Sequence, residues 1–238
     1  MKKLSLMLLT IVGVLSGCNS DEENLPIDLK VKEITIVDDE LAALDVPVFT
    51  YENGLLTSYH LQNGVSANFV YDGQNLVHWE NNSDMGYSHD ISYENGWPAL
   101  ITSTNGFGDV TTSEITYNAG ELATAGQTEF YWANGNLTKK VFSSGRTFEF
   151  TYGPQFNPFR SMPITWKNHG CSEFWGLMTQ SENVCLSKKV YNTASQELLP
   201  QYSYTFEMVY NDDNYPTQIK ARRMSDNVIA ITYTIEYQ

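Results

Sequence analysis

The sequence predicts an all-β protein: a single curled antiparallel meander, half-barrel or barrel-like, of imperfect hairpin repeats with one irregular or short-helical insertion. Three observations predict this fold. Apolar and polar residues alternate with a period of two in several segments, Asn-Gly pairs recur at turn positions, and a short motif ending in an aromatic residue repeats along the chain. The 238 residues, of which 13% are aromatic, are enough for one domain with a sizeable core.

The first element, residues 1–17, is expected to be a signal peptide that is removed on export. A basic pair, Lys2-Lys3, precedes the uncharged, mostly apolar run 4–15, which is shorter than the ~20 residues that span a bilayer. The run ends in Leu15-Ser16-Gly17-Cys18, which resembles the bacterial lipobox, so Cys18 is the expected lipidation site. The alternative is an ordinary secreted protein with an unrelated cysteine.

Residues 18–29 are interpreted as the lipidated cysteine and an acidic tether. The residues after the cysteine resemble the Ser-plus-acidic signal that carries Bacteroides-type lipoproteins to the outer face of the outer membrane: Ser20, Asp21, Glu22 and Glu23. A solvated linker is the alternative reading of the same acidic run. The expected location is therefore the outer membrane, with the protein held by lipid and exposed at the cell surface.

The formal charge of the chain limits its partners. It is −14, and loss of the leader leaves 12 Lys plus Arg against 28 Asp plus Glu, or −16. Nucleic acids and anionic membrane surfaces bind clustered cations, so such a polyanion is a poor partner for either. The expected partners are the outer membrane, through the lipid anchor, and a glycan or an outer-membrane protein.

Residues 30–238 are expected to form one β domain. Strict alternation at 147–152, 202–210 and 229–237 predicts half-buried antiparallel strands. Asn-Gly occurs at 53–54, 63–64, 95–96, 105–106 and 134–135, and Asp72-Gly73 adds a sixth turn of this kind. Both residue types tolerate the positive φ of hairpin turns.

An internal repeat accompanies these turns. Each copy has an apolar residue, an aromatic residue two positions later, a turn containing Gly, and then Leu or Pro. The clearest copies begin with Phe49-x-Tyr51, Phe69-x-Tyr71, Ile91-x-Tyr93, Ile115-x-Tyr117 and Phe130-x-Trp132. The aromatic residues from 51 to 152 stand 15 to 24 positions apart, which fits one hairpin per copy. Aromatic residues at matching strand ends are expected to pack the core.

An insertion at about 153–190 interrupts the repeat. Its prolines disfavour regular pairing, and residues 172–180 fit a short helical turn, so a plug or lid for the sheet is expected. Cys171 and Cys185 form an even pair in an oxidising compartment, which predicts a disulfide. The alternative is Cys171 as a nucleophile beside His169.

Several of these motifs together resemble a known family. They are the repeated Tyr-x-x-Gly-x-Leu, the segments 157–159, 174–177 and 210–216, and a C-terminal segment that is predicted to be a strand. The set resembles a Bacteroides-type family of outer-membrane lipoproteins of unknown function with a porin-like β fold, and the repeat is distantly similar to the YD-repeat of Rhs-type shell proteins. The resemblance supplies no catalytic residue. Because the polar strand face carries Thr, Ser and Glu, the apolar face is expected to point inward, unlike that of a transmembrane barrel.

The sequence contains no nucleotide-binding or hydrolase motif, and its four His residues stand singly. We therefore expect no catalytic residue, cofactor or metal, and favour a non-enzymatic binding module for a glycan or a partner protein. An extracellular glycan hydrolase, using some pair among the 28 acids, and a structural subunit of an outer-membrane complex are the alternatives.

Tryptophan residues in polar or turn contexts are the candidate ligand-binding residues, because sugars stack on exposed rings. Trp79 lies in a polar stretch, Trp97 lies at an Asn-Gly turn before a proline, and Trp166 lies in the insertion. Trp132 occupies the core-like position of the repeat and is set aside. The alternative is that all these rings only cover the ends of the sheet.

Overall fold

A computed structural model describes residues 29–38, 43–83, 86–118, 120–160 and 181–238. Several predicted features lie outside these residues: the leader 1–17, Cys18 and nearly all of the tether with its export signal, Trp166, Cys171 and the helical turn 172–180.

The described residues form an all-β structure in one antiparallel sheet of seventeen strands. A three-residue 3-10 helix, η1 (Pro200–Tyr202), is the one helix among the described residues. In chain order the strands are β1 (Val31–Asp38), β2 (Ala43–Asp45), β3 (Val48–Glu52), β4 (Leu55–His60), β5 (Ser66–Asp72), β6 (Asn75–Asn81), β7 (Tyr87–Glu94), β8 (Trp97–Asn105), β9 (Val110–Asn118), β10 (Glu121–Ala125), β11 (Thr128–Ala133), β12 (Asn136–Phe142), β13 (Arg146–Phe156), β14 (Asn183–Asn192), β15 (Tyr204–Tyr210), β16 (Pro216–Arg223) and β17 (Ile229–Tyr237).

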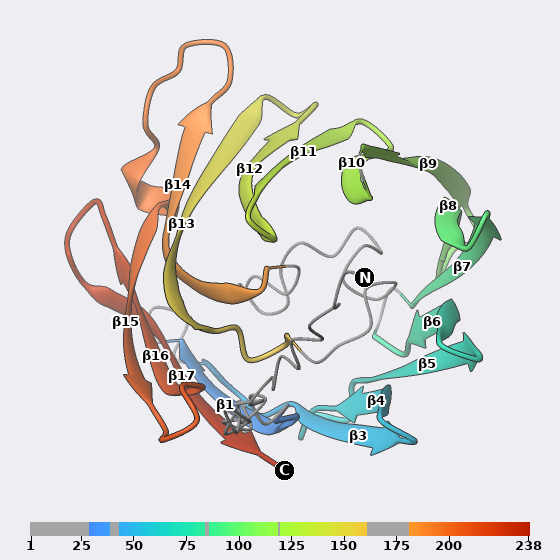
Figure 1. The fold of residues 1–238 in the computed structure, drawn as a ribbon, viewed down its shortest axis with the longest axis horizontal. Helices are drawn as coiled ribbons and strands as arrows, with labels where there is room; N and C mark the ends of the chain where they lie inside the picture. The colour runs from blue at the N-terminus through green and yellow to red at the C-terminus, as the bar shows by residue number, and fades with distance from the viewer. Residues whose placement is uncertain (1–28, 39–42, 84–85, 119, 161–180) are drawn as a thin grey trace, which may run out of the picture.

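The sheet closes into a barrel, with β1 beside β17 at the seam (Figure 1). β1 pairs with β17 from Val31↔Tyr237 to Asp38↔Ile231, and its other edge pairs with β2 and with β3. Because β2 and β3 share one place along β1, the ring has 16 strand positions. The predicted all-β antiparallel fold is confirmed. The open or half-barrel form is wrong, because the first and last strands pair with each other and close the sheet.

The two ends of the barrel differ. We call one the turn end: it holds the tight hairpins at 53–54, 95–96 and 134–135, the start of β1 and the end of β17. The opposite end, which we call the loop end, holds the connections that follow β4, β6 and β8. In the three tight hairpins of the turn end, the Asn has φ of 49 to 53° and the Gly φ of 72 to 87°, as a type I′ turn requires.

The sequence repeat is a structural unit at the turn end. Within a hairpin the aromatic residue pairs across to the Leu or Pro of the returning strand, as in Tyr71↔Leu76, and a bulge adjoins the pair. The same aromatic residue also bonds to the preceding hairpin. We call this set the aromatic ladder: Tyr71 to Leu56 O at 2.8 Å, Tyr93 to Leu76 O at 2.6 Å, Trp132 to Leu122 O at 2.7 Å, Tyr152 to Leu137 O at 2.6 Å and Tyr237 to Pro216 O at 2.7 Å.

Apolar side chains line the inside of the barrel, as the sequence predicts. Their exposed fractions are 8% or less, and they come from successive strands: Ile34, Phe49, Leu56, Phe69, Leu76, Ile91, Ile101, Ile115, Leu122, Phe130, Leu137 and Phe150. The alternate residues point outward and are polar on most strands, as Thr112, Glu114 and Thr116 are on β9. A transmembrane barrel has the reverse arrangement, with its apolar residues outside.

The strands extend into both ends of the predicted 153–190 insertion. β13 continues to Phe156 and β14 begins at Asn183, with an irregular register between the two strands at this end. The irregular part is therefore shorter than the prolines alone suggested, because Pro154 lies where the pairing is interrupted.

The start of the shortened connection lies inside the barrel at the turn end. Phe159 is fully buried and its ring lies 6.1 Å from that of Phe49 on β3. The ring of Phe156 lies 5.4 Å from that of Tyr215, which precedes β16. These contacts reach across from β13 to other parts of the ring, as a plug would.

Candidate functional site

The wall of the barrel opens between β10 and β11. These strands pair at two positions only, Thr124↔Glu129 and Ala125↔Thr128. The copy of the repeat that contains them is the shortest, with Tyr117 and Trp132 only 15 positions apart, so β10 and β11 have only five and six residues. A bulge at residues 122–124, in the pairing of β10 with β9, bends β10 further.

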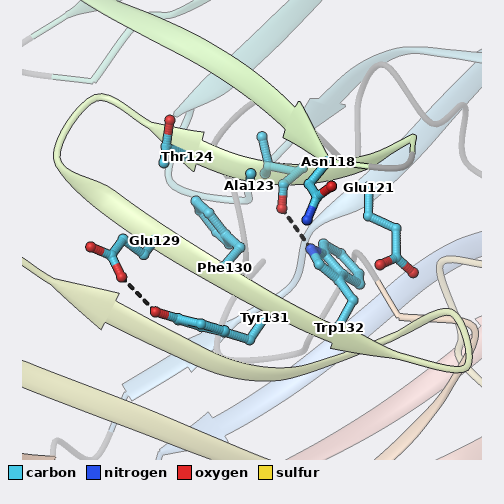
Figure 2. A pocket seen from close by; sticks show the side chains of 9 residues that line it. Asn118, Glu121, Ala123, Thr124, Glu129, Phe130, Tyr131 and Trp132 are labelled. Carbon is cyan, nitrogen blue, oxygen red and sulfur yellow. Dashed lines mark hydrogen bonds between the residues drawn. The ribbon is translucent and has the colours of Figure 1, made fainter.

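The opening forms a cavity of about 390 Å³, which we call the β10–β11 cleft (Figure 2). Both strands and the end of β9 contribute to its lining, which consists of Asn118, Glu121, Leu122, Ala123, Thr124, Glu129, Phe130, Tyr131 and Trp132. The volume lies in the range of small-molecule sites.

The inner part of the cleft is apolar and fixed in place. Leu122 and Phe130 are buried, and Trp132 is half-buried. The indole Nε1–H of Trp132 donates to the carbonyl oxygen of Leu122 at 2.7 Å, beyond the point where the backbone ladder between the two strands ends. Trp132 is therefore both a member of the aromatic ladder and a wall of the cleft.

The outer part of the cleft is polar. Glu121 and Glu129 are exposed, and the Tyr131 hydroxyl donates to Glu129 Oε2 at 2.6 Å. This hydrogen bond, together with the negative charge of Glu129, raises the pKa of the Tyr131 phenol. Lys139 of β12 lies over the Tyr131 ring, 5.5 Å from its centre. Thr124 is held by a 2.7 Å hydroxyl–hydroxyl contact with Thr116 of β9.

This arrangement suits a small ligand that has both an apolar face and hydroxyl groups. Tyr131 and Trp132 offer rings, and Asn118, Glu121 and Glu129 offer amide and carboxylate groups at the rim. A sugar has these two properties, because its C–H face stacks on a ring while its hydroxyls need hydrogen-bond partners.

Trp79, the first of the predicted residues, faces the inside of the barrel. It belongs to an inner row of rings that crosses neighbouring strands, with Phe69 6.2 Å away on one side and His89 4.1 Å away on the other. The His89 ring nitrogen Nδ1 lies 2.8 Å from Ser103 Oγ. Burial lowers the pKa of His89 to about 4, the charge of His78 adding to this effect. The surroundings of Trp79 are those of a packed side chain.

Trp97 lies at the tip of the β7–β8 hairpin, at the turn end of the barrel. Its exposed fraction is 38%, and its ring lies 5.0 Å from that of Tyr117. Trp79 and Trp97 therefore belong to different regions, the inner wall and the turn end. Trp166 lies outside the described residues.

Trp132 and Tyr131 line the cleft but are not among the binding residues that the sequence predicts. Trp132 was set aside because it occupies the core-like position of the repeat, and the structure shows that this position also faces the cleft. Two signals in the sequence mark the place: the shortest spacing of the repeat, and the run Glu129-Phe130-Tyr131-Trp132, which puts a carboxylate beside three rings.

Cys185 is buried on β14, and its Sγ donates to the carbonyl oxygen of Ser187 at 3.2 Å. No disulfide is found among the described residues. Cys171 lies outside them, so its pairing with Cys185 stays a prediction.

No group of three or more His, Cys, Asp and Glu side chains that could hold a metal ion occurs in the part of the chain that the structure describes. His78 on β6 bonds through Nδ1 to Asp90 of β7 at 2.7 Å. Within the described ranges, no helix is long and apolar enough to cross a membrane.

Comparisons with known proteins show the fold. No protein-family model matches the chain, and no curated protein matches it. A porin-like protein from Bacteroides uniformis has a similar structure, with 13% sequence identity and a TM-score of 0.53, over 87% of this chain and 96% of that one. A porin-like protein from Bacteroides vulgatus matches with 9% identity and a TM-score of 0.45, over 89% of this chain and 99% of that one.

Proposed function

We propose that this chain is a non-enzymatic, lipid-anchored protein of the outer membrane that binds a glycan in the β10–β11 cleft. The lipobox-like sequence at Cys18 and the acidic run after it support the anchor and the exposure at the cell surface. The described chain starts at the turn end of the barrel, so a tether would attach there. The motifs that resemble the Bacteroides-type lipoprotein family and the YD-repeat agree with this proposal.

The observation that carries glycan binding is the composition of the cleft. Tyr131 is an exposed ring on β11, its orientation is set by the bond to Glu129, and the half-buried Trp132 lies beside it in the same cavity. Pre-positioned rings with polar groups at the rim reduce the entropy that a ligand loses on binding.

Binding fits the carboxylates of the cleft better than hydrolysis does. A glycosidase needs one carboxyl group that keeps its proton near neutral pH, and burial is the usual cause. Glu121 and Glu129 are both exposed, so neither has the buried surroundings that this role usually requires.

A glycan array with the purified protein tests the proposal. Tyr131→Ala should remove most of the binding, while Tyr131→Phe, which keeps the ring and loses only the bond to Glu129, should retain it. Trp97→Ala is the comparison variant at the turn end and should bind like the wild type. If the wild type binds no glycan, the proposal is wrong. If Trp97→Ala loses binding and Tyr131→Ala keeps it, the site lies at the tip of the β7–β8 hairpin and not in the cleft.

A partner protein is the second candidate, because the loop end of the barrel exposes large apolar side chains. Phe107 is 80% exposed, Leu44 61% and Val110 60%, all at connections or strand ends of that end. Phe107 and Val110 belong to the same β8–β9 hairpin, and exposed apolar groups that lie together indicate an interaction surface. A photo-crosslinking residue at Phe107 should then capture a protein in intact cells, and the same residue at Trp97 should not.

A further inference from the structure

Positive charge is unevenly distributed along the chain. Between residues 33 and 138 there is no Lys or Arg, while there are 15 Asp and Glu residues. This stretch contains all of β2 to β11, so these strands carry no fixed cation. Lys and Arg return at Lys139 and Lys140 on β12. The β10–β11 cleft lies at the end of the cation-free wall.

The cleft adds its own negative charge to that of the wall. Figure 2 shows Glu121 of β10 and Glu129 of β11 at opposite sides of the cavity. One carboxylate oxygen of Glu129 accepts the hydrogen bond from the Tyr131 hydroxyl, and the other oxygen can accept a hydrogen bond from a ligand. Two cations of β12 lie against lining residues without lining the cleft themselves: Lys139 is 5.5 Å from the centre of the Tyr131 ring, and the buried Lys140 is 5.3 Å from that of Phe130.

We propose that the cleft selects sugars that carry a protonated primary amine over their N-acetylated forms, and rejects uronic and sulfated sugars. The inference rests on the proposed glycan binding and names the charge class of that glycan. An ammonium group is attracted to the faces of aromatic rings and donates strong hydrogen bonds to carboxylates. Acetylation removes this charge, and a sugar carboxylate or sulfate would meet Glu121 and Glu129 with no fixed cation lining the cleft.

Calorimetric titration of the purified protein tests the inference with three probes of equal length: a glucosamine oligomer, its N-acetylated counterpart and a uronic acid oligomer. The glucosamine oligomer should bind about tenfold more tightly than the N-acetylated one, as one charge-assisted contact predicts. High salt should narrow this difference, because both carboxylates are exposed and therefore screened. The uronic acid oligomer should bind most weakly.

Three charge-neutralising variants separate a contact in the cleft from a general effect of net charge. Glu121→Gln should reduce the preference for the amine, and Lys139→Gln should increase it. Glu94→Gln is the matched control: Glu94 is also exposed in the cation-free wall, but it lies on the β7–β8 hairpin outside the cleft. It should leave the preference unchanged.

The outcomes distinguish this inference from the proposed function. If the glucosamine and N-acetylated oligomers bind equally, or the uronic acid oligomer binds as tightly, the charge selectivity is wrong while glycan binding stands. If Glu94→Gln has the same effect as Glu121→Gln, the preference comes from net charge and the inference is overturned. If no oligomer of any class binds, the proposed function itself fails.

Discussion

The indole N–H of Trp132 donates to the carbonyl oxygen of Leu122 at 2.7 Å, across the place where β10 and β11 separate. At the other rungs of the aromatic ladder a tyrosine makes the equivalent bond, as Tyr71 does to Leu56. The same repeat position thus links neighbouring hairpins at five places in the barrel, and at Trp132 it also faces the cleft because β10 and β11 are short.

The aromatic ladder predicts that removal of the hydroxyl group has different effects on the free energy of unfolding at two tyrosines, Tyr71 and Tyr117. Tyr71→Phe removes a hydroxyl that donates to Leu56 O at 2.8 Å and should lower the free energy of unfolding by about 1 kcal/mol. Burial raises the pKa of both Tyr71 and Tyr117, which keeps their phenols protonated.

Tyr117→Phe is the matched control. The Tyr117 hydroxyl is buried and finds no hydrogen-bond partner among the described residues, so its removal should be neutral or stabilising by up to about 1 kcal/mol. Urea unfolding of both variants measures the difference. Equal losses of stability would show that the ladder bonds contribute nothing specific.

Acidification should destabilise the barrel through His89. Its pKa is lowered to about 4 in the folded protein, mainly by burial, whereas an unfolded chain has a value of about 6.5. Above the unfolded value the ring is neutral in both states and adds no pH dependence. Between about 6.5 and 4 only the unfolded chain takes up the proton, so stability falls as the pH falls.

His89→Gln should flatten this part of the pH profile. Carboxylates elsewhere also respond to acid, so the informative quantity is the difference between variant and wild type in urea midpoints measured from pH 7 to pH 4. The ring is partly exposed, and solvent screening will reduce the effect. Parallel profiles for the two proteins would contradict the assignment.

Lipid anchoring predicts that Cys18→Ala moves the protein from the membrane fraction to the soluble fraction. Acyl chains on Cys18 are the proposed anchor, and two or more chains hold a protein firmly. Fractionation of cells, with Cys185→Ala as the control that keeps Cys18, measures this. Sedimentation of Cys18→Ala with membranes would mean that another attachment exists.

The predicted disulfide is tested by counting thiols. If Cys171 and Cys185 are bonded and Cys18 carries lipid, the denatured protein should show no free thiol by Ellman titration. Two titrating thiols would remove the bridge and restore Cys171 as a candidate nucleophile.

Much of the fold could be predicted from the sequence, because its determinants are local. Asn53-Gly54 and the equivalent pairs specify type I′ turns, and alternation such as that of 229–237 specifies strands with one apolar face. Closure could not be predicted, because it depends on pairing between Val31 and Tyr237, which lie at opposite ends of the described chain.

The cleft could not be predicted from the sequence for a related reason. A local pattern assigns Trp132 to the inner face, and this is right. What exposes it is the failure of β10 and β11 to pair beyond Thr124↔Glu129, a property of two strands and a bulge rather than of any one residue. Trp79 shows the converse: its polar neighbours in sequence suggested exposure, but its ring stacks on His89 inside the barrel.

The most direct test of the account is a crystal structure of the protein with the tightest-binding oligosaccharide from the array. We expect a sugar ring between β10 and β11, in contact with Tyr131 or Trp132 and with a carboxylate of Glu121 or Glu129. Density for the sugar at Trp97 on the turn end, or along the inner row beside Trp79, would contradict the assignment of the β10–β11 cleft as the binding site.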